Sequence, residues 1–473
     1  MGGLSPGSLA TRLNAILMSP HLQDGFWGIT VYAPMRGRFL YERNEAQLFR
    51  TASNMKILTN LLVFDHLGPD YRFETRLGYT GDIMDGVLKG DLVLVGGGDP
   101  SISGRDDHLP LGELLDPLIS MIRNAGVKRI DGNLVGLLNF FDDRTIQDSW
   151  EWDDVGRNYC VPVSPLMLND GLTRLDFMAD RDDSLQLSHH PSGQYGVQFQ
   201  HQLSYLRGEL DLDISRDWGG NGFLVRGNLP LCMDVSVSFG VWDPAMQFLA
   251  VFREYLREAG IELSGTCQLS RQPQPLQYLG TLQSEPVAFL AQTFMKDSRN
   301  HYGEMFLKTV GKVVAGDGSF EGGIGVADQF LRGLDPSFAT ALAMFDGSGL
   351  SARNHLSPLQ LTVLLDYGLK QSYAPQWLAS FPIMGRDGTL SNRGLRSLAR
   401  ERVRAKTGTI FRTKNLSGYV ETLAGEPLIF SIMVNNFSCP TKQITMAQDQ
   451  ICNILVQLKP NRTVRRKLRL GGI

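Results

Sequence analysis

The segment at residues 51–60, TASNMKILTN, decides how the rest of this sequence is interpreted. It opens an apolar run that continues as LLVFDHLGPD, and its aliphatic residues predict a largely buried helix that ends before Gly68 and Pro69. Ser53 and Lys56 stand three residues apart at the start of this run, so on a helix their side chains share one face and can meet. A lysine in the first turn of a buried helix needs an explanation.

The Ser53 and Lys56 pair has the chemistry of an activated nucleophile. A serine hydroxyl attacks well only when a base takes its proton, and a lysine amine becomes such a base when burial and nearby cations lower its pKa. The helix start would also place Ser53 beside N–H groups able to form an oxyanion hole. The alternative is a capping serine followed by a lysine whose amine reaches solvent. Because Ser-x-x-Lys occurs by chance roughly once or twice in a chain of this size, the pair alone does not distinguish a catalytic serine from a capping serine.

Two further motifs favour the catalytic interpretation. Residues 298–300 form a Ser-x-Asn pattern just before a helical segment. Residues 406–409, Lys-Thr-Gly-Thr, lie in a strand pattern that a short turn joins to a second strand, NLSGYVE. Ser-x-x-Lys, a Ser-x-Asn type motif and Lys-Thr-Gly are the signature of penicillin-binding proteins and class A β-lactamases. Here the three motifs occur in that order, in helix, loop and strand contexts respectively.

With these motifs the chain resembles the class C low-molecular-mass penicillin-binding proteins, the penicillin-binding protein 4 type of D-alanyl-D-alanine carboxypeptidase/endopeptidase. Other segments resemble that family in the same order: LGPDYRFETRL, LKGDLVLVGGGDPS, DGSGLSARNHLSP, GRDGTLSNR and AKTGTIFRTKNLSGYV. The resemblance covers nearly the whole chain. The long stretch between Ser53 and Ser298 resembles the inserted domains of that family, whereas a class A β-lactamase would leave far less room.

The resemblance implies a role for each motif residue. Ser53 would attack the carbonyl of the penultimate D-alanine to give an acyl-enzyme, with Lys56 taking its proton. Ser298 would relay a proton between Lys56 or Lys406 and the leaving amine, and Asn300 would hydrogen-bond the peptide carbonyl of the substrate. Peptidoglycan peptides would be the substrates and β-lactams the acylating inhibitors, in the periplasm or cell envelope. No metal or organic cofactor is implied.

The same resemblance assigns the Lys-Thr-Gly-Thr strand to substrate binding. Lys406 would supply positive charge near Ser298 and the substrate carboxylate. The hydroxyls of Thr407 and Thr409, on either side of Gly408, would be further donors, and the backbone N–H groups of Ser53 and Thr409 would form the oxyanion hole. Two lysines that face one pocket also disfavour each other's charge, which would help to keep Lys56 neutral.

Two segments depart from the family pattern. Ala352 stands where the family usually has an arginine, with Arg353 one step further, and residues 137–139 (Leu-Leu-Asn) replace an Asp-x-Ser pattern. These family positions line the pocket for the free amino-acid end of a diaminopimelate side chain. Arg353 and Asp142 as stand-ins are a hypothesis. The sequence leaves carboxypeptidase and endopeptidase activity both open, together with a β-lactamase or esterase on the same scaffold and a catalytically idle wall-binding protein.

The pattern of elements predicts the domain organisation. A short helix at residues 9–18, a few strands and the helix after Ser53 come first, and long amphipathic helices and two strands return after residue 285. Between them lie short alternating strands that one helix, at residues 111–126, interrupts. We therefore expect an α/β (α+β) fold of the β-lactamase/transpeptidase type, an antiparallel sheet flanked by helices, from residues 1–72 and 283–473. Residues 73–282 would be a β-rich insertion of two subdomains.

The composition excludes several other classes of protein. A net charge of −3 gives no reason to expect nucleic acid as a partner, and no run of about eighteen apolar residues predicts a membrane span. The N-terminal residues lack the pattern of a signal peptide. The five cysteines form no CxxC pair and the eight histidines no HExxH motif, which argues against a metal site. Disulfides and the oligomeric state stay open.

Overall fold

The computed structural model describes residues 6–104, 110–179, 185–190, 196, 198–204, 209–217, 219–230, 233–340 and 343–459. The chain forms two compact units. The first consists of Met1–Tyr71, Pro286–Gly316 and Phe320–Ile473, and the second of Arg72–Glu285 and Asp317–Ser319. The proposal from the sequence had put these boundaries at residues 72/73 and 282/283.

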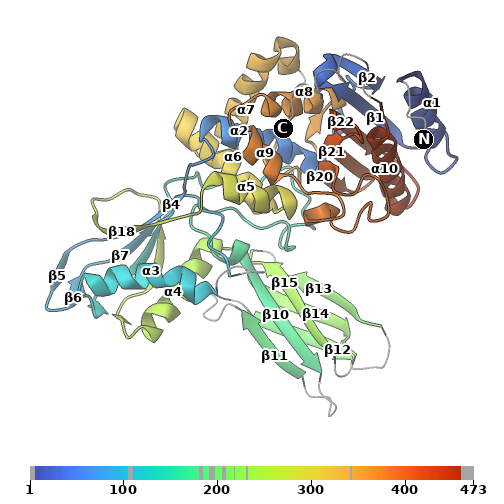
Figure 1. The fold of residues 1–473 in the computed structure, drawn as a ribbon. Coiled ribbons are helices and arrows are strands. Elements are labelled where there is room, and N and C mark those ends of the chain that lie inside the picture. The colour runs from blue at the N-terminus through green and yellow to red at the C-terminus, as the bar shows by residue number, and fades with distance from the viewer. Residues whose placement is uncertain are drawn as a thin grey trace. The chain divides into compact units, whose positions relative to one another are not determined.

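The first unit is built on a five-stranded antiparallel sheet in the order β2-β1-β22-β21-β20 (Figure 1). Its strands are β1 (Phe26–Ala33), β2 (Arg38–Arg43), β20 (Val403–Ile410), β21 (Thr413–Glu421) and β22 (Pro427–Asn435). The sheet thus joins both ends of the chain. Residues on both faces of β22 are buried, as expected for a strand covered by helices on both sides. The predicted antiparallel sheet flanked by helices is confirmed.

Helices cover both faces of this sheet because its side chains alternate. Ile29 and Val31 of β1 share a core with the apolar faces of α1 and α10. On the opposite face, the Thr30 hydroxyl bonds Thr362 in α8, and Gly28 leaves room for the ring of Phe49. The helices of this unit are α1 (Pro6–Leu17), α2 (Met55–His66), α5 (Val287–Lys296), α6 (Asn300–Ala315), α7 (Phe320–Leu334), α8 (Pro358–Leu369), α9 (Ala374–Ser380) and α10 (Thr441–Val456). A small two-stranded sheet pairs β3 (Phe49–Arg50) with β19 (His355–Leu356).

The second unit contains two large hydrophobic cores and a small cluster of Val93, Val95, Val135 and Leu137. Helices α3 (Leu111–Asn124) and α4 (Pro244–Glu258) share the larger core with apolar residues of two sheets. The strands of those sheets are β4 (Glu74–Tyr79), β5 (Asp82–Met84), β6 (Val87–Lys89), β7 (Leu92–Val95), β8 (Arg129–Ile130), β9 (Leu134–Leu137), β16 (Glu262–Leu263), β17 (Cys267–Ser270) and β18 (Gln277–Gln283).

The smaller core lies between two three-stranded sheets, in the orders β11-β10-β15 and β12-β14-β13. Their strands are β10 (Leu172–Ala179), β11 (Leu185–His190), β12 (Gln198–Ser204), β13 (Asp211–Arg216), β14 (Gly222–Asn228) and β15 (Asp234–Gly240). The rings of Phe177, Phe223 and Phe239 fill much of this core. The separation of the two large cores supports our proposal that the insertion consists of two subdomains.

Two predictions of secondary structure were wrong. The insertion holds a second long helix, α4, which Asp243 caps by accepting the N–H of Met246, and whose apolar residues recur at helical spacing. Residues 416–437, which the sequence pattern predicts as one strand, belong to two strands, because a turn at Gly425, with a φ of 78°, separates β21 from β22. The N–H of Thr422 closes this turn by donating to the carbonyl of Glu426.

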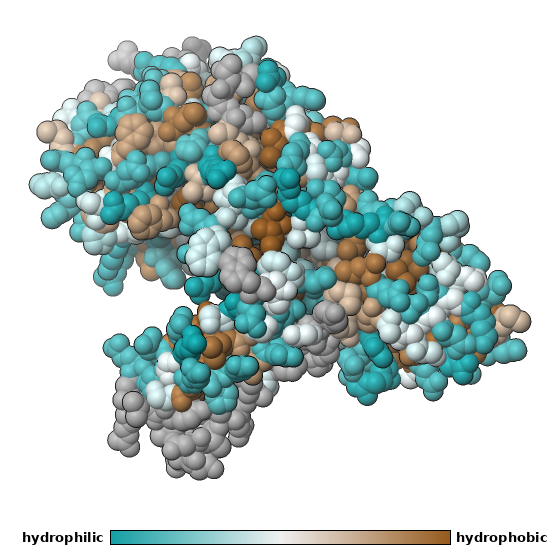
Figure 2. Space-filling model, turned by 180° about the vertical axis from the view of Figure 1, so that it is seen from behind, coloured by the Kyte–Doolittle hydropathy of each residue, from teal (hydrophilic) through white to brown (hydrophobic). Residues whose placement is uncertain are grey.

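The surface is predominantly polar on the face that Figure 2 shows, where apolar side chains gather in small separate patches. Among the described residues, no helix is both long and apolar enough to span a membrane.

Candidate active site

Ser53 lies in a strained turn at the entrance to α2. The turn, η2 (Ala52–Asn54), is a single 3-10 turn, and the α-helix begins directly after it at Met55. Ala52 has a φ of 43°, a left-handed conformation that costs about 1–3 kcal/mol for a residue other than glycine. Gly349 packs against this turn, since a Cβ there would lie 1.8 Å from the carbonyl oxygen of Ala52. The backbone therefore holds Ser53 in one position.

The Lys56 amine is buried beside the Ser53 hydroxyl. Its side chain is fully buried, and Nζ lies 3.1 Å from Ser53 Oγ, 2.6 Å from Asn300 Oδ1 and 2.8 Å from the carbonyl oxygen of Ser348. Three partners match the three hydrogen-bonding directions of a lysine amine. Burial lowers the pKa of Lys56 to about 7, against the opposing charges of Glu304 and Asp346. A neutral amine is thus accessible near neutral pH.

Two buried acids near Lys56, Glu304 and Asp346, were not predicted from the sequence. Glu304 accepts hydrogen bonds from the N–H groups of Gly347 (2.8 Å) and Ser348 (3.0 Å), and so fixes the loop whose carbonyl meets Lys56. Burial, followed by the charge of Asp346, raises the pKa of Glu304 to about 8. Glu304 lies four residues after Asn300 on α6, so helical spacing from the Ser-x-Asn motif was the available signal.

Asp346 organises the other side of the same loop. Its carboxylate accepts the N–H groups of Gly349 (2.7 Å) and Ser351 (2.6 Å) and the side-chain amide of Asn354 (2.7 Å). Asp346 is fully buried. Together the two acids hold the loop at residues 347–351 against Lys56 and the Ser53 turn.

A second lysine and serine pair lies in the same unit. Lys406 Nζ donates to Ser298 Oγ at 2.9 Å and to the carbonyl oxygen of Thr407 at 3.1 Å. Ser298 has a φ of 61°, and α6 begins two residues later at Asn300. Burial lowers the pKa of Lys406 well below its usual value, and the charge of Lys56 lowers it further. Asn300 at the start of α6 contacts Lys56 directly, which connects the Ser-x-Asn motif with the Ser53 pair.

Strand β20 approaches the Ser53 turn closely at Gly408. A Cβ at this position would lie 2.8 Å from the carbonyl oxygen of Thr51 and 3.2 Å from the N of Asn54. The Asn54 side chain ties the turn to the sheet, because its amide donates to the carbonyl of Lys406 at 2.9 Å and its oxygen accepts from Ser417 at 2.8 Å. Only glycine permits this contact between strand and turn.

The N–H of Thr409 points away from the sheet. On the edge strand β20, the N–H of Ala405 donates outward to the carbonyl of Pro382 rather than to β21. Because N–H directions repeat every two residues along a strand, Thr407 and Thr409 direct their N–H groups to the same outer side. The Thr407 hydroxyl bonds that of Thr389 at 2.9 Å, whereas the Thr409 side chain is exposed.

The residues that depart from the family pattern have different surroundings. Leu137 and Leu138 are buried in hydrophobic clusters of the second unit, and Asn139 is exposed. In the first unit Ala352 is half-buried and Arg353 exposed. The stand-in roles of Arg353 and Asp142 stay predictions.

No group of three or more His, Cys, Asp or Glu side chains suited to a metal ion occurs in the described part of the chain. Four cysteines there are free thiols: Cys160, Cys267, Cys439 and Cys452. Cys232 lies outside the described residues.

Known D-alanyl-D-alanine carboxypeptidases match this chain over most of its length. A D-alanyl-D-alanine carboxypeptidase from Actinomadura sp. is 30% identical over 464 residues, which cover 91% of this chain and 82% of that protein. The D-alanyl-D-alanine carboxypeptidase DacB of Haemophilus influenzae is 25% identical over 414 residues, covering 85% and 84%.

Solved structures share the fold. The crystal structure of penicillin binding protein 4 (dacB) from Haemophilus influenzae matches with a TM-score of 0.82 at 24% identity, covering 96% of this chain and 99% of that one. The same protein in complex with a β-lactam matches with a TM-score of 0.78 at 23% identity, over the same shares of the two chains.

The match to a family profile is equally extensive, and it confirms the resemblance inferred from the motifs. The profile of the D-Ala-D-Ala carboxypeptidase 3 (S13) family spans residues 9–458. This chain therefore belongs to the D-Ala-D-Ala carboxypeptidase 3 (S13) family.

Proposed function

We propose that this protein is a serine DD-peptidase that cleaves peptidoglycan peptides after D-alanine, through an acyl-enzyme on Ser53. The observation that carries the proposal is the buried Lys56 amine, 3.1 Å from the Ser53 hydroxyl, with its pKa lowered to about 7. A neutral buried amine at this distance is a competent general base for a serine nucleophile.

The acylation step uses both lysine and serine pairs. Ser53 Oγ attacks the carbonyl carbon of the penultimate D-alanine, and its proton passes to Lys56 Nζ. The N–H groups of Ser53 and Thr409 stabilise the oxyanion that forms. The C–N bond then breaks, and the leaving amine takes a proton from Ser298. Ser298 recovers that proton from Lys56, directly or through Lys406, so that Lys56 is neutral again. Attack by water on the ester, with Lys56 again as base, releases the peptide acid and restores Ser53.

The remaining motif residues bind the substrate. The Asn300 oxygen faces Lys56 at 2.6 Å, so its amide nitrogen is the group that donates to the peptide carbonyl of the substrate. Lys406 supplies positive charge for the carboxylate beside the scissile bond, and the Thr407 and Thr409 hydroxyls are further donors. Both the C-terminal D-alanine and the D-centre of a diaminopimelate crosslink present such a carboxylate, so carboxypeptidase and endopeptidase action share this site.

We place the enzyme in the cell envelope, because its substrate, peptidoglycan, lies there. The β-lactam complex of the Haemophilus influenzae relative supports β-lactams as inhibitors that acylate Ser53. Arg353, exposed in the first unit, is our candidate for the free end of a diaminopimelate side chain. Unchanged turnover of diaminopimelate-containing peptides by Arg353→Ala would remove it from that role.

Labelling with a fluorescent penicillin tests the proposed function. Wild type should become covalently labelled and Ser53→Ala should not, with equal thermal stability as the control for folding. Absence of wild-type labelling, with retained peptidoglycan binding, would indicate an idle wall-binding protein instead. Label that appears and is then rapidly lost would indicate a β-lactamase. Mass spectrometry of products from intact, crosslinked peptidoglycan, with Ser53→Ala as control, separates D-alanine release from crosslink cleavage.

A further inference from the structure

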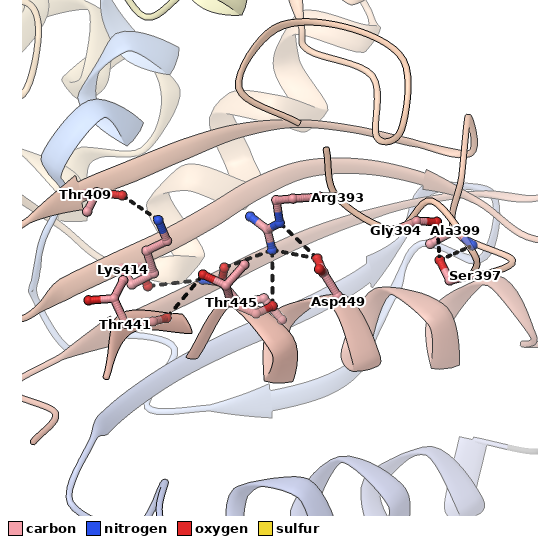
Figure 3. A network of polar contacts seen from close by, with 10 residues as sticks. Arg393, Gly394, Ser397, Ala399, Thr409, Lys414, Thr441, Thr445 and Asp449 are labelled. Atoms are coloured by element: carbon pink, nitrogen blue, oxygen red, sulfur yellow. Dashed lines mark hydrogen bonds and ion pairs between the residues drawn. The ribbon is translucent and has the colours of Figure 1, made fainter. Parts of the chain in front are cut away.

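Lys414 lies directly beside the last residue of the Lys-Thr-Gly-Thr motif. It occupies β21 opposite Thr409 of β20, and its Nζ donates to Thr409 Oγ1 at 2.8 Å (Figure 3). Neither the Ser-x-x-Lys, the Ser-x-Asn nor the Lys-Thr-Gly motif includes this residue. The structure thus adds Lys414 of β21 to the two lysines of the motifs, Lys56 of α2 and Lys406 of β20.

The contact fixes which way the Thr409 hydroxyl donates. A lysine ammonium has only donors, so Thr409 Oγ1 must be the acceptor in this hydrogen bond. The single proton of the hydroxyl is then left to donate to another acceptor. Since the Thr409 side chain is exposed, a carboxylate bound along the outer edge of β20 is a suitable acceptor.

No acid in the described part of the chain forms an ion pair with Lys414. The nearby carboxylate of Asp449 accepts instead from Arg393, with Nη2 at 2.7 Å and Nε at 3.0 Å, as Figure 3 shows. Lys414 itself takes part in none of the ion pairs found between described residues. Partial burial lowers the pKa of Lys414 and the charge of Arg393 lowers it further, against the opposing charge of Asp449. A half-buried cation next to a second cation is stabilised by an incoming anion.

The backbone around Lys414 is firmly held. Its carbonyl accepts from the side chain of Gln448 on α10 at 3.1 Å, and its neighbour Asn415 bonds the backbone of the strand leading to Ser53. The amine therefore has a defined position relative to Thr409, and through it relative to the substrate edge of β20.

We propose that Lys414 is a specificity-determining residue that favours substrates with a free carboxylate beside the scissile amide. The Thr409 hydroxyl donates to this carboxylate, and the Lys414 ammonium both orients that hydroxyl and adds positive charge. The inference rests on the proposed function, because it requires the substrate carboxylate to bind at Thr409. The ligand class is a D-amino acid with its carboxylate free, as opposed to an amide or ester.

Hydrolysis of two matched peptides tests the inference. Both end in D-Ala-D-Ala, one as the free acid and one as the C-terminal amide, and kcat/KM is measured for each. Lys414→Met should lower kcat/KM for the acid about tenfold, and leave that for the amide within about twofold, as expected for loss of a charge-assisted contact. The preference for the acid should therefore fall about tenfold. Lys414→Arg, which keeps the charge, should retain most of it.

Arg412→Met is the matched control. Arg412 is an exposed cation at the turn between the same two strands, with its guanidinium over the ring of Phe411. Its removal takes away the same charge without touching Thr409, and should leave the preference for the acid at the wild-type value. Equal loss in Arg412→Met and Lys414→Met would overturn the inference, because it would reduce the effect to overall charge.

The outcomes separate this inference from the proposed function. If wild type hydrolyses neither peptide and is not acylated by penicillin, the proposed function fails. If wild type is active and Lys414→Met keeps its preference for the acid, only the role of Lys414 fails. Where the amide is turned over too slowly, acylation by benzylpenicillin and by its methyl ester replaces the two peptides. Lys414→Gln, which keeps a donor without charge, should lose the same preference and serves if the methionine variant does not fold.

Discussion

Adding one methyl group at Gly408 should slow acylation of Ser53 without touching any motif side chain. In Gly408→Ala the new Cβ would lie 2.8 Å from the carbonyl oxygen of Thr51, 3.2 Å from the N of Asn54 and 3.3 Å from the Cβ of Ala52. Carbon atoms in ordinary contact are about 3.5–4.0 Å apart. The strand and the Ser53 turn must therefore separate by about half an ångström.

Hydrogen bonds between the turn and the sheet oppose this separation. The side-chain amide of Asn54 binds the carbonyl of Lys406, and that of Asn415 binds the carbonyl of Thr51 at 2.8 Å, so the turn and the sheet are tied on both sides of Gly408. A displacement of about 1 Å in a catalytic group can cost about a hundredfold in rate, so half of that suggests about tenfold. Overpacking should also lower the free energy of unfolding by about 1–3 kcal/mol.

The measurement is the second-order rate constant for labelling of Ser53 by a fluorescent penicillin. Thermal unfolding is measured in parallel. Gly325→Ala is the control, because a Cβ built on this exposed glycine of α7 has no atom within 4 Å apart from its chain neighbours and the backbone of its own helix. It should label at the wild-type rate and gain up to about 1 kcal/mol, since alanine favours a helix over glycine. Wild-type labelling and wild-type stability in Gly408→Ala would show that the strand and the turn accommodate the methyl group without moving Ser53.

Three further predictions concern Lys56 and the stability of the first unit. The kcat/KM of wild type should rise with pH through the pKa of Lys56, lowered by burial to about 7, because only the neutral amine accepts the Ser53 proton; a flat profile between pH 5 and 9 would contradict this role. Lys56→Met should lose about 10²–10⁴-fold in acylation rate together with this acidic limb, and a retained limb would assign it to another group. Arg36 and Glu426 form a bidentate ion pair at 2.6 and 2.7 Å, with side chains 3% and 0% exposed. Glu426→Gln should therefore lower the free energy of unfolding, measured by urea denaturation, by about 3–5 kcal/mol. A loss under 1 kcal/mol would mean that solvent reaches the pair.

Much of the catalytic unit could be predicted from local pattern. Ser53 and Lys56 are three residues apart, so helical geometry alone brings them together, and the apolar run after them predicts the burial that lowers the lysine pKa. Alternating strands at both ends of the chain predicted the antiparallel sheet. The helix α4 was missed although Asp243, Pro244 and the spacing of its apolar residues are ordinary start and face signals, because the surrounding strand pattern was extended over it.

The motifs, their order and the type of fold could thus be predicted from residue type and from spacing over a few residues. The surroundings of the motifs depend on how distant segments pack in the folded chain. In the folded chain Lys406 hydrogen-bonds Ser298, and Lys414 hydrogen-bonds Thr409. The charges of Glu304 and Asp346 act on Lys56. Charge and burial act through space, and the strands and loops that carry these groups meet only after the chain has folded. The lowered pKa values of Lys56, Lys406 and Lys414 therefore follow from contacts between segments that are distant in the sequence.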